Sequence, residues 1–194
     1  MPNKWNLSKE FILASQSPQR LKLLNDAGFT PIECVVANIN EDILEEETPK
    51  RYVARVSIEK AKYVAQQKPN ICIVSADTVI VAKRRIIRKA ANEAIARQNL
   101  DLLSGQKHHV LTGFCVIYPN GKQINKVISS TVYMKKLTES EKDALIASKE
   151  WENVAAYRIE GMLSTFVKSI KGSYPNIVGL PIYEIADILK EVLK

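Results

Sequence analysis

The stretch FILASQSPQRLKLL, residues 11–24, contains the change of pattern that decides the fold. Its first four residues, Phe11 to Ala14, are apolar or small and have no polar face, which is typical of a strand covered on both sides. Ser17 followed by Pro18 is a common start of a helix, and the leucines behind them supply an apolar side. The stretch therefore predicts a buried strand that runs directly into a helix.

The junction between this strand and this helix carries groups that suit a phosphate. Free backbone N–H groups, the hydroxyls of Ser15 and Ser17 and the guanidinium of Arg20 are expected to point toward one spot. On these residues alone an ordinary capped junction is the favoured interpretation, and an anion site is the alternative.

The chain has 194 residues, of which 46% are hydrophobic and 25% charged, and this suffices for a core without disulfides or a structural metal. We expect one domain over residues 1–194. The three cysteines, Cys34, Cys72 and Cys115, lie far apart in apolar runs, so they are predicted to be reduced core residues of a cytosolic protein. Because neither a signal peptide nor a membrane span is evident, we expect a cytoplasmic location and no membrane partner.

The formal net charge of +7 favours polyanionic partners, a class that includes nucleic acids and phosphorylated small molecules. The basic residues are scattered and no aromatic residues are interleaved with them, so we expect no nucleic-acid partner. A basic nucleic-acid-binding module stays a rival function. A steep salt dependence of binding to random oligonucleotides would support it.

Strand-like and helix-like segments alternate along the rest of the chain, which predicts an α/β fold. Further strands are expected at residues 32–39, 71–75 with a continuation at 79–82, 110–118, 122–135 and 166–170. Helices are expected from Thr48-Pro49 to Val64, at 91–103, from a capping box at Thr138 and Glu141, and at 182–193, with a loop at 172–175. Because residues 110–135 contain a long hairpin, the sheet is predicted to be mixed.

Asp77 is expected at the end of an almost purely apolar strand within ICIVSADTVIVA, residues 71–82. Burial of a carboxylate is costly unless the group is paired or bound to metal. Glu41 also follows a predicted strand, and hard cations prefer oxygen ligands, so the two residues predict a divalent metal site. The alternative is that Asp77 caps a local turn or pairs with one basic side chain.

Six segments, in chain order, carry a resemblance to a known family: LASQSPQRLKLLNDAGF, NINED, RVSIEKA, SADTVIV, LDLLSGQKHHVLTGF and GSYPNIVGLPIYE. They resemble the signatures of the Maf family of nucleoside triphosphate pyrophosphatases and cover nearly the whole chain. The resemblance implies a strongly twisted mixed sheet with flanking helices and two lobes around a cleft, similar to inosine triphosphatases. It also implies hydrolysis of a nucleoside triphosphate to the monophosphate and pyrophosphate with Mg²⁺ or Mn²⁺, in a house-cleaning role linked to arrest of division, and often a homodimer.

The resemblance also assigns roles to individual residues. The catalytic group that it implies consists of Asp77 as proton acceptor, Glu41, Lys60 and Lys89, with Glu41 and Asp77 holding the metal. The substrate-binding positions that it implies are Ser15, Ser17, Gln19, Arg20, Thr78, Glu160, Ser173 and Asn176.

Three of these positions sort the family by the base of the substrate, and they give a mixed signature. Thr78 agrees with members that resemble dTTP and UTP pyrophosphatases, Glu160 agrees with members that resemble 7-methyl-GTP pyrophosphatases, and Gln19 matches neither group. A carboxylate at Glu160 favours a base edge with two donors, such as guanine. The preferred base therefore stays open.

The chain departs from the family's pattern at Asn40, Asn153 and Ala155. The loss of a charge at Asn153 and of a glycine at Ala155 predicts reduced activity. A low-activity or inactive nucleotide-binding regulatory protein is therefore the second function that we consider. Metal-dependent release of pyrophosphate would distinguish the enzyme from it.

Overall fold

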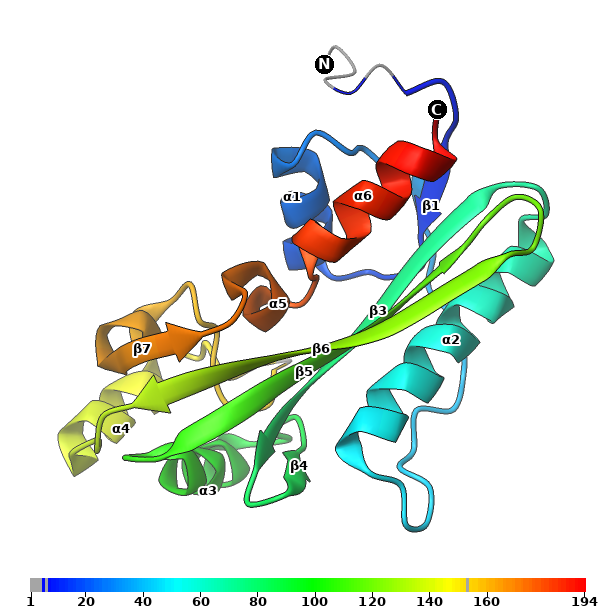
Figure 1. Ribbon diagram of the computed structural model, residues 1–194. Helices are drawn as coiled ribbons and strands as arrows, with labels where there is room; N and C mark the ends of the chain where they lie inside the picture. Colours follow the sequence, from blue (N-terminus) through cyan, green and yellow to red (C-terminus); the bar gives the residue numbers. More distant parts are fainter. Residues whose placement is uncertain (1–4, 6, 153) are drawn as a thin grey trace. The chain divides into compact units, whose positions relative to one another are not determined.

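The computed structural model describes residues 5, 7–152 and 154–194 (Figure 1). Its helices and strands are, in chain order, β1 (Phe11–Leu13), α1 (Pro18–Asp26), β2 (Glu33–Cys34), α2 (Pro49–Gln67), β3 (Cys72–Ala82), β4 (Arg85–Ile87), α3 (Glu93–Leu103), β5 (Lys107–Ile117), β6 (Gln123–Met134), α4 (Glu139–Ala147), the 3₁₀ helix η1 (Met162–Phe166), β7 (Val167–Lys171), α5 (Tyr174–Val178) and α6 (Ile182–Val192).

Within these residues seven strands form one sheet in the order β2-β1-β3-β5-β6-β7, and β4 pairs with β3. The strand β1 pairs in parallel with β2 and β3, whereas β4 pairs with β3 and β7 with β6 in the antiparallel sense. The predicted α/β fold with a mixed sheet and flanking helices is confirmed.

The chain divides into two compact units. Unit 1 comprises the described residues of Met1–Thr78, Thr112–Ile128 and Gly179–Lys194, and unit 2 those of Val79–Leu111 and Ser129–Val178. The strands β3, β5 and β6 each contribute residues to both units. The strong twist of the sheet and the cleft between two lobes stay predictions.

Unit 1 has helices on both faces of its part of the sheet. Phe11 and Leu13 of β1 belong to an apolar cluster with α1 and α6. Ile12 of β1 and Ala14, the residue after the strand, belong to a second cluster with α2. Successive side chains of a strand point to opposite faces, and all four of these are at most 2% exposed. This coverage on both sides explains why the opening stretch shows no polar face.

The helix α2 begins as predicted and packs very closely on β5. The Thr48 hydroxyl accepts a hydrogen bond from the backbone N–H of Arg51 at 3.3 Å, and Pro49 occupies the first turn. A Cβ atom on Gly113 of β5 would lie only 2.2 Å from the carbonyl oxygen of Val53. Because only glycine leaves room for this crossing, Gly113 sets the position of α2 on the sheet.

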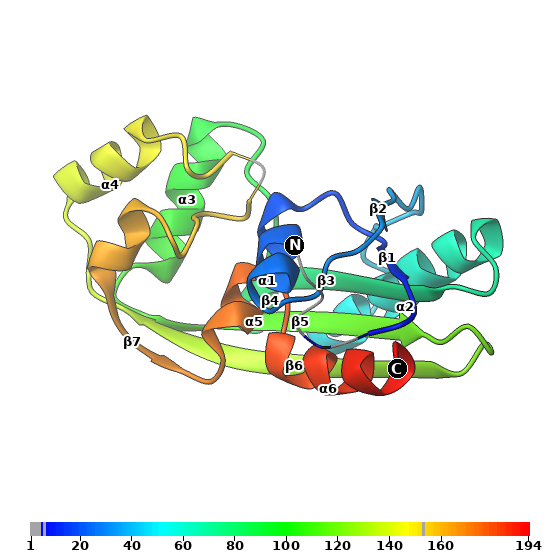
Figure 2. The ribbon, with the colours of Figure 1, turned by 90° about the horizontal axis from the view of Figure 1, so that it is seen from above.

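Unit 2 places α3 and α4 side by side (Figure 2). Leu100 and Leu103 of α3 and Leu145 of α4 share one apolar cluster with residues of β3, β4, β5 and β6. The capping box predicted at the start of α4 is confirmed, because Thr138 and Glu141 each accept a hydrogen bond from the other's backbone N–H.

The expected strand over residues 32–39 is wrong in length, because only β2, Glu33–Cys34, forms there. Outside β2, the backbone N–H groups of Ile32 and Val35 still donate to carbonyls of β1. Cys34 is exposed at this edge of the sheet, so its assignment to the core is also wrong, whereas Cys72 and Cys115 are buried. Because β2 is the outermost strand of the sheet, it has a neighbouring strand on one side only, and its residues can stay exposed.

Asp77 does not end a strand, because β3 continues without a break from Cys72 to Ala82 and Asp77 is its sixth residue. The apolar residues on both sides of Asp77 belong to one strand. The short helix α5 begins inside the expected loop at 172–175, and neither β4 nor η1 was predicted.

Unit 2 also buries a histidine. His108 of β5 is fully buried, and its Nε2 lies 2.5 Å from the hydroxyl oxygen of Tyr157. Burial, with a smaller contribution from His109, lowers the pKa of His108 from 6.5 to about 4. The folded protein therefore keeps His108 neutral at a pH where an unfolded chain takes up a proton.

Acid should therefore weaken the fold through His108. Because the pKa of His108 is lower in the folded state, its contribution to stability is complete above pH 6.5 and is lost as the pH falls toward 4. We expect the free energy of unfolding to fall by about 2 kcal/mol between pH 7 and pH 5 in urea titrations. His108→Gln should abolish this part of the pH dependence and His109→Gln should keep it. Equal slopes in all three proteins would contradict the prediction.

Candidate functional site

The junction between β1 and α1 has the predicted cap. The Ser17 hydroxyl accepts from the backbone N–H of Arg20 at 3.4 Å, and the Ser17 N–H donates to the Ser15 hydroxyl at 3.2 Å. The Ser17 hydroxyl in turn donates to the Gln19 side-chain oxygen at 3.3 Å. Three residues predicted to bind substrate, Ser15, Ser17 and Gln19, thus share one hydrogen-bonded turn.

Arg20 reaches from this turn to other parts of unit 1. Its guanidinium donates to the Ser15 hydroxyl at 3.0 Å, the Thr78 hydroxyl at 3.2 Å and the carbonyl of Gly179 at 2.9 Å. The pKa of Arg20 is lowered, because the effect of burial exceeds the opposite effect of the negative charges of Asp77 and Glu41. Since arginine stays protonated in proteins, Arg20 is a partly buried cation whose charge interacts with those of Asp77 and Glu41.

Thr78 and Gly179 complete the surroundings of Arg20. The Thr78 hydroxyl lies 2.9 Å from the Thr112 hydroxyl and 3.3 Å from the Gly179 carbonyl. Gly179 has a φ of +131°, a conformation that favours glycine, and a Cβ there would lie 3.6 Å from both Arg20 Nε and Thr78 Oγ1. The glycine therefore lets the chain turn its carbonyl toward Arg20.

Lys60 joins the two predicted acidic residues. Lys60 lies on α2, and its Nζ is 2.9 Å from Oδ1 of Asp77 and 3.1 Å from Oε1 of Glu41. The side chains of Lys60 and Asp77 are 12% and 11% exposed, whereas that of Glu41 is 45% exposed. Asp77 thus pairs with a basic side chain, as the alternative to a metal site predicts. This ion pair compensates the burial of Asp77.

Tyr52 is a member of this cluster that sequence reasoning missed. Its hydroxyl donates to the backbone carbonyl of Glu41 at 3.0 Å. Burial and the charges of Asp77 and Glu41 raise the pKa of Tyr52 to about 12, so the hydroxyl keeps its proton at neutral pH. In the sequence, Tyr52 is only one of several apolar residues of the helix, and nothing marks its hydroxyl.

Asp77 and Glu41 are the two residues predicted to bind a metal. Within the part of the chain that the structure describes, no group of three or more His, Cys, Asp or Glu side chains is arranged to hold a metal ion. Mg²⁺, however, is commonly bound by one or two carboxylates together with water and phosphate oxygens of a substrate. Two carboxylates that meet at one ammonium fit that kind of site.

The other four predicted residues, Lys89, Glu160, Ser173 and Asn176, belong to unit 2. Lys89 and Glu160 are exposed. Asn176 is buried, and its side-chain amide donates to the carbonyl of Val110 at 3.2 Å and the hydroxyl of Ser130 at 3.0 Å. The Ser173 hydroxyl accepts from the backbone N–H of Asn176 at 3.3 Å, so these two residues hold the loop before α5 in place.

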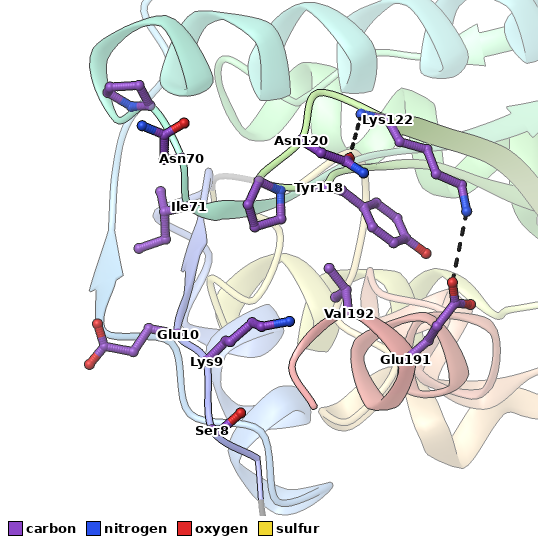
Figure 3. Close-up of a pocket in the computed structure, with 12 residues that line it drawn as sticks. Ser8, Lys9, Glu10, Asn70, Ile71, Tyr118, Asn120, Lys122, Glu191 and Val192 are labelled. Carbon is purple, nitrogen blue, oxygen red and sulfur yellow. Dashed lines mark hydrogen bonds and ion pairs between the residues drawn. The ribbon is translucent and has the colours of Figure 1, made fainter.

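A cavity of about 990 Å³ lies elsewhere in unit 1 (Figure 3). Tyr118, Asn120 and Lys122 line it from the turn between β5 and β6, and Lys122 forms an ion pair of 3.8 Å with Glu191 of α6. None of the predicted site residues lines this cavity. The size of this cavity therefore does not point to the predicted site residues.

A sequence-family model described as Maf-like protein matches residues 10–192 of the chain. The chain belongs to the Maf family. A dTTP/UTP pyrophosphatase of Caulobacter vibrioides is 41% identical over 179 residues, which cover 92% of this chain and 93% of the relative. A nucleoside triphosphate pyrophosphatase of Ehrlichia ruminantium is 41% identical over 181 residues, with 93% and 94% covered. The solved Ham1 protein of Staphylococcus aureus has a TM-score of 0.46, 13% identity, and 65% and 72% coverage.

Among the departures from the Maf pattern, Asn40 has a local structural role through its side chain. The Asn40 side chain accepts from the backbone N–H of Asp42 at 2.8 Å and so closes a turn beside Glu41. The carbonyl of Ala155 accepts from the Asn99 side chain at 2.6 Å. Asn153 lies outside the described residues, so the effect of its lost charge stays a prediction.

In the described part of the chain, no helix combines the length and hydropathy that crossing a bilayer requires.

Removal of the Lys60 ammonium should destabilise the protein. Lys60→Met leaves the buried carboxylate of Asp77 without its cation, and we expect the free energy of unfolding in urea to fall by about 3 kcal/mol. Lys62→Met, on the exposed side of the same helix, should change it by no more than about 0.5 kcal/mol. Equal stability of the two variants would show that the ion pair does not compensate the burial of Asp77.

Proposed function

We propose that this Maf protein hydrolyses a nucleoside triphosphate to the monophosphate and pyrophosphate. The observation that carries the proposal is the cluster in unit 1, where Lys60 joins Asp77 to Glu41 and the cation Arg20 binds Thr78, the residue after Asp77. Pyrophosphatase is also the activity in the names of the curated relatives.

The cations of the cluster suit the phosphate chain. Arg20 provides positive charge for phosphate oxygens, and the N-terminus of α1 beside it adds the positive end of the helix dipole. Lys60 carries a second positive charge beside the carboxylates. Neutralising the phosphate oxygens in this way lowers the barrier to attack on phosphorus, since the charge of the transition state is spread over them.

Asp77 is the residue that we assign to the attacking water. Its carboxylate accepts the proton of the water, and the hydrogen bond from Lys60 at 2.9 Å holds it in one orientation. A divalent cation, Mg²⁺ or Mn²⁺, would be held by Glu41 and Asp77, and when bound it neutralises phosphate oxygens and acidifies water.

Other features of the proposal rest on the family resemblance. Lys89 is assigned to the phosphate clamp, and Ser173 and Asn176 to substrate binding. A house-cleaning role, a link to arrest of division, a cytoplasmic location and a homodimer also stay predictions.

Asp77→Asn tests the assignment of the proton acceptor. The amide cannot accept the proton of the water, so we expect pyrophosphate release to fall at least about a hundredfold. Binding of a non-hydrolysable UTP analogue should persist, and Glu45→Gln on the exposed acidic segment should keep full activity. Turnover at the wild-type rate in Asp77→Asn would remove Asp77 from this role.

The wild-type protein should be assayed first for pyrophosphate release from a panel of standard and modified triphosphates, with and without Mg²⁺. If it binds nucleotides but releases no pyrophosphate, the proposed activity is wrong and the regulatory nucleotide-binding function is favoured.

Glu160→Gln tests the choice of base. Thr78 agrees with the dTTP/UTP group to which the Caulobacter relative belongs by name, whereas Glu160 favours a base edge with two donors. An amide at position 160 offers a donor to the carbonyl oxygens of uracil and thymine. We expect the ratio of kcat/KM for UTP to that for GTP to rise about tenfold. An unchanged ratio would exclude Glu160 from base selection.

A further inference from the structure

Glu41 lies in a segment that has neither helix nor strand, residues 35–48 between β2 and α2. Its side chain is 45% exposed, and the segment turns at Glu46 with a φ of +55°. Backbone of this kind does not hold a side chain in place without contacts to other elements. The position of Glu41 at Lys60 therefore depends on what holds the segment.

Two side chains of α2 bind consecutive carbonyl groups of the segment. Tyr52 donates to the carbonyl of Glu41 at 3.0 Å, and the Arg55 guanidinium donates to the carbonyl of Asp42 at 2.8 Å. Lys60, on the same helix, binds the carboxylate of Glu41. Three residues of one helix thus fix the backbone and the side chain of Glu41 together.

Arg55 makes the larger share of these contacts. It donates to both carboxylate oxygens of Glu47, at 2.7 and 2.9 Å, and to Glu59 at 3.1 Å, and its guanidinium lies 5.6 Å from the centre of the Tyr52 ring. Glu47 also accepts from the backbone N–H of Leu44 at 3.1 Å. Hydrogen bonds from Arg55 hold the pKa of Glu47 below its usual value.

This arrangement differs from an ordinary surface ion pair. The side chains of Arg55 and Glu47 are only 19% and 7% exposed, so water screens the pair weakly. The Arg55 guanidinium makes four hydrogen bonds, two of them to the two oxygens of Glu47, and an ammonium with three N–H groups on one atom cannot make all four. The contacts of Arg55 require arginine.

We propose that Arg55 is a positioning residue. Together with Glu47 and Tyr52 it holds Glu41 beside Lys60 and Asp77. This inference rests on the proposed function, in which Glu41 serves hydrolysis. It assigns to Arg55 an effect on the reaction that passes through Glu41 and requires no contact between Arg55 and the substrate.

A double-mutant cycle tests this route. Arg55→Lys keeps the charge and loses the paired contacts, and it should lower kcat/KM for UTP about tenfold. In a Glu41→Gln background the same change should cost less than about twofold, because the residue through which Arg55 acts is already altered. A tenfold loss in both backgrounds, or no loss in either, would overturn the proposal.

Amide hydrogen exchange supplies a readout that does not need activity. The amides of residues 40–47 should exchange at least about tenfold faster in Arg55→Lys than in the wild type. Arg51→Lys, an exposed position on the same helix, is the matched control and should change neither exchange nor kcat/KM. Unchanged exchange in Arg55→Lys would overturn the proposal.

The design separates this proposal from the proposed function. A wild-type protein that releases no pyrophosphate defeats the function, while the exchange measurement still decides whether Arg55 holds the segment. If Arg55→Lys does not fold, Glu47→Gln weakens the same contact from the loop side and leaves α2 intact. It should reproduce both the tenfold loss and the faster exchange, and failure to do so would count against Arg55 as a positioning residue.

Discussion

The ammonium of Lys60 between two carboxylates is the interaction on which the site depends. It joins the long helix α2 to Asp77 in the middle of β3 and to Glu41 in a segment without regular structure. Without Lys60, the two carboxylates would be costly to hold this near each other, because like charges repel and Asp77 is only 11% exposed. With Lys60 between them, the protein keeps two negative groups together, and the cation Arg20 binds Thr78, the residue after Asp77.

Regular elements and an irregular segment of unit 1 both contribute residues to this cluster. Asp77 is held by a strand with apolar side chains packed on both faces, and Arg20 by hydrogen bonds to three separate segments. Glu41 has no such framework of its own. Its position is set by side chains of α2, so one helix connects the part that is held by packing to the part that is held by hydrogen bonds.

Most of the fold and part of the cluster could be predicted from local sequence patterns. The caps at Ser17, Thr48 and Thr138 involve residues three apart in the chain, so their pattern is visible in the sequence. The true length of β2 and the continuity of β3 depend on which strands lie alongside. That information is tertiary, and an apolar run does not contain it.

The same distinction applies to the cluster. Asp77 attracts attention because a carboxylate interrupts an apolar run, and Arg20 because it follows a capped turn. Tyr52 and Arg55 show no such contrast, since a tyrosine and an arginine near the start of an amphipathic helix are ordinary. Each of them donates to a backbone carbonyl of a loop, and only the folded chain shows that contact.

The crossing of α2 over Gly113 has a consequence for how this helix tolerates change in length. Because the backbone at Val53 lies directly against β5, the helix has no freedom to slide or rotate at that point. One residue inserted between Val53 and Lys60 would turn everything beyond it by about 100° and advance it by about 1.5 Å. The ammonium would then leave both carboxylates, so the number of residues between Val53 and Lys60 cannot change without loss of the cluster.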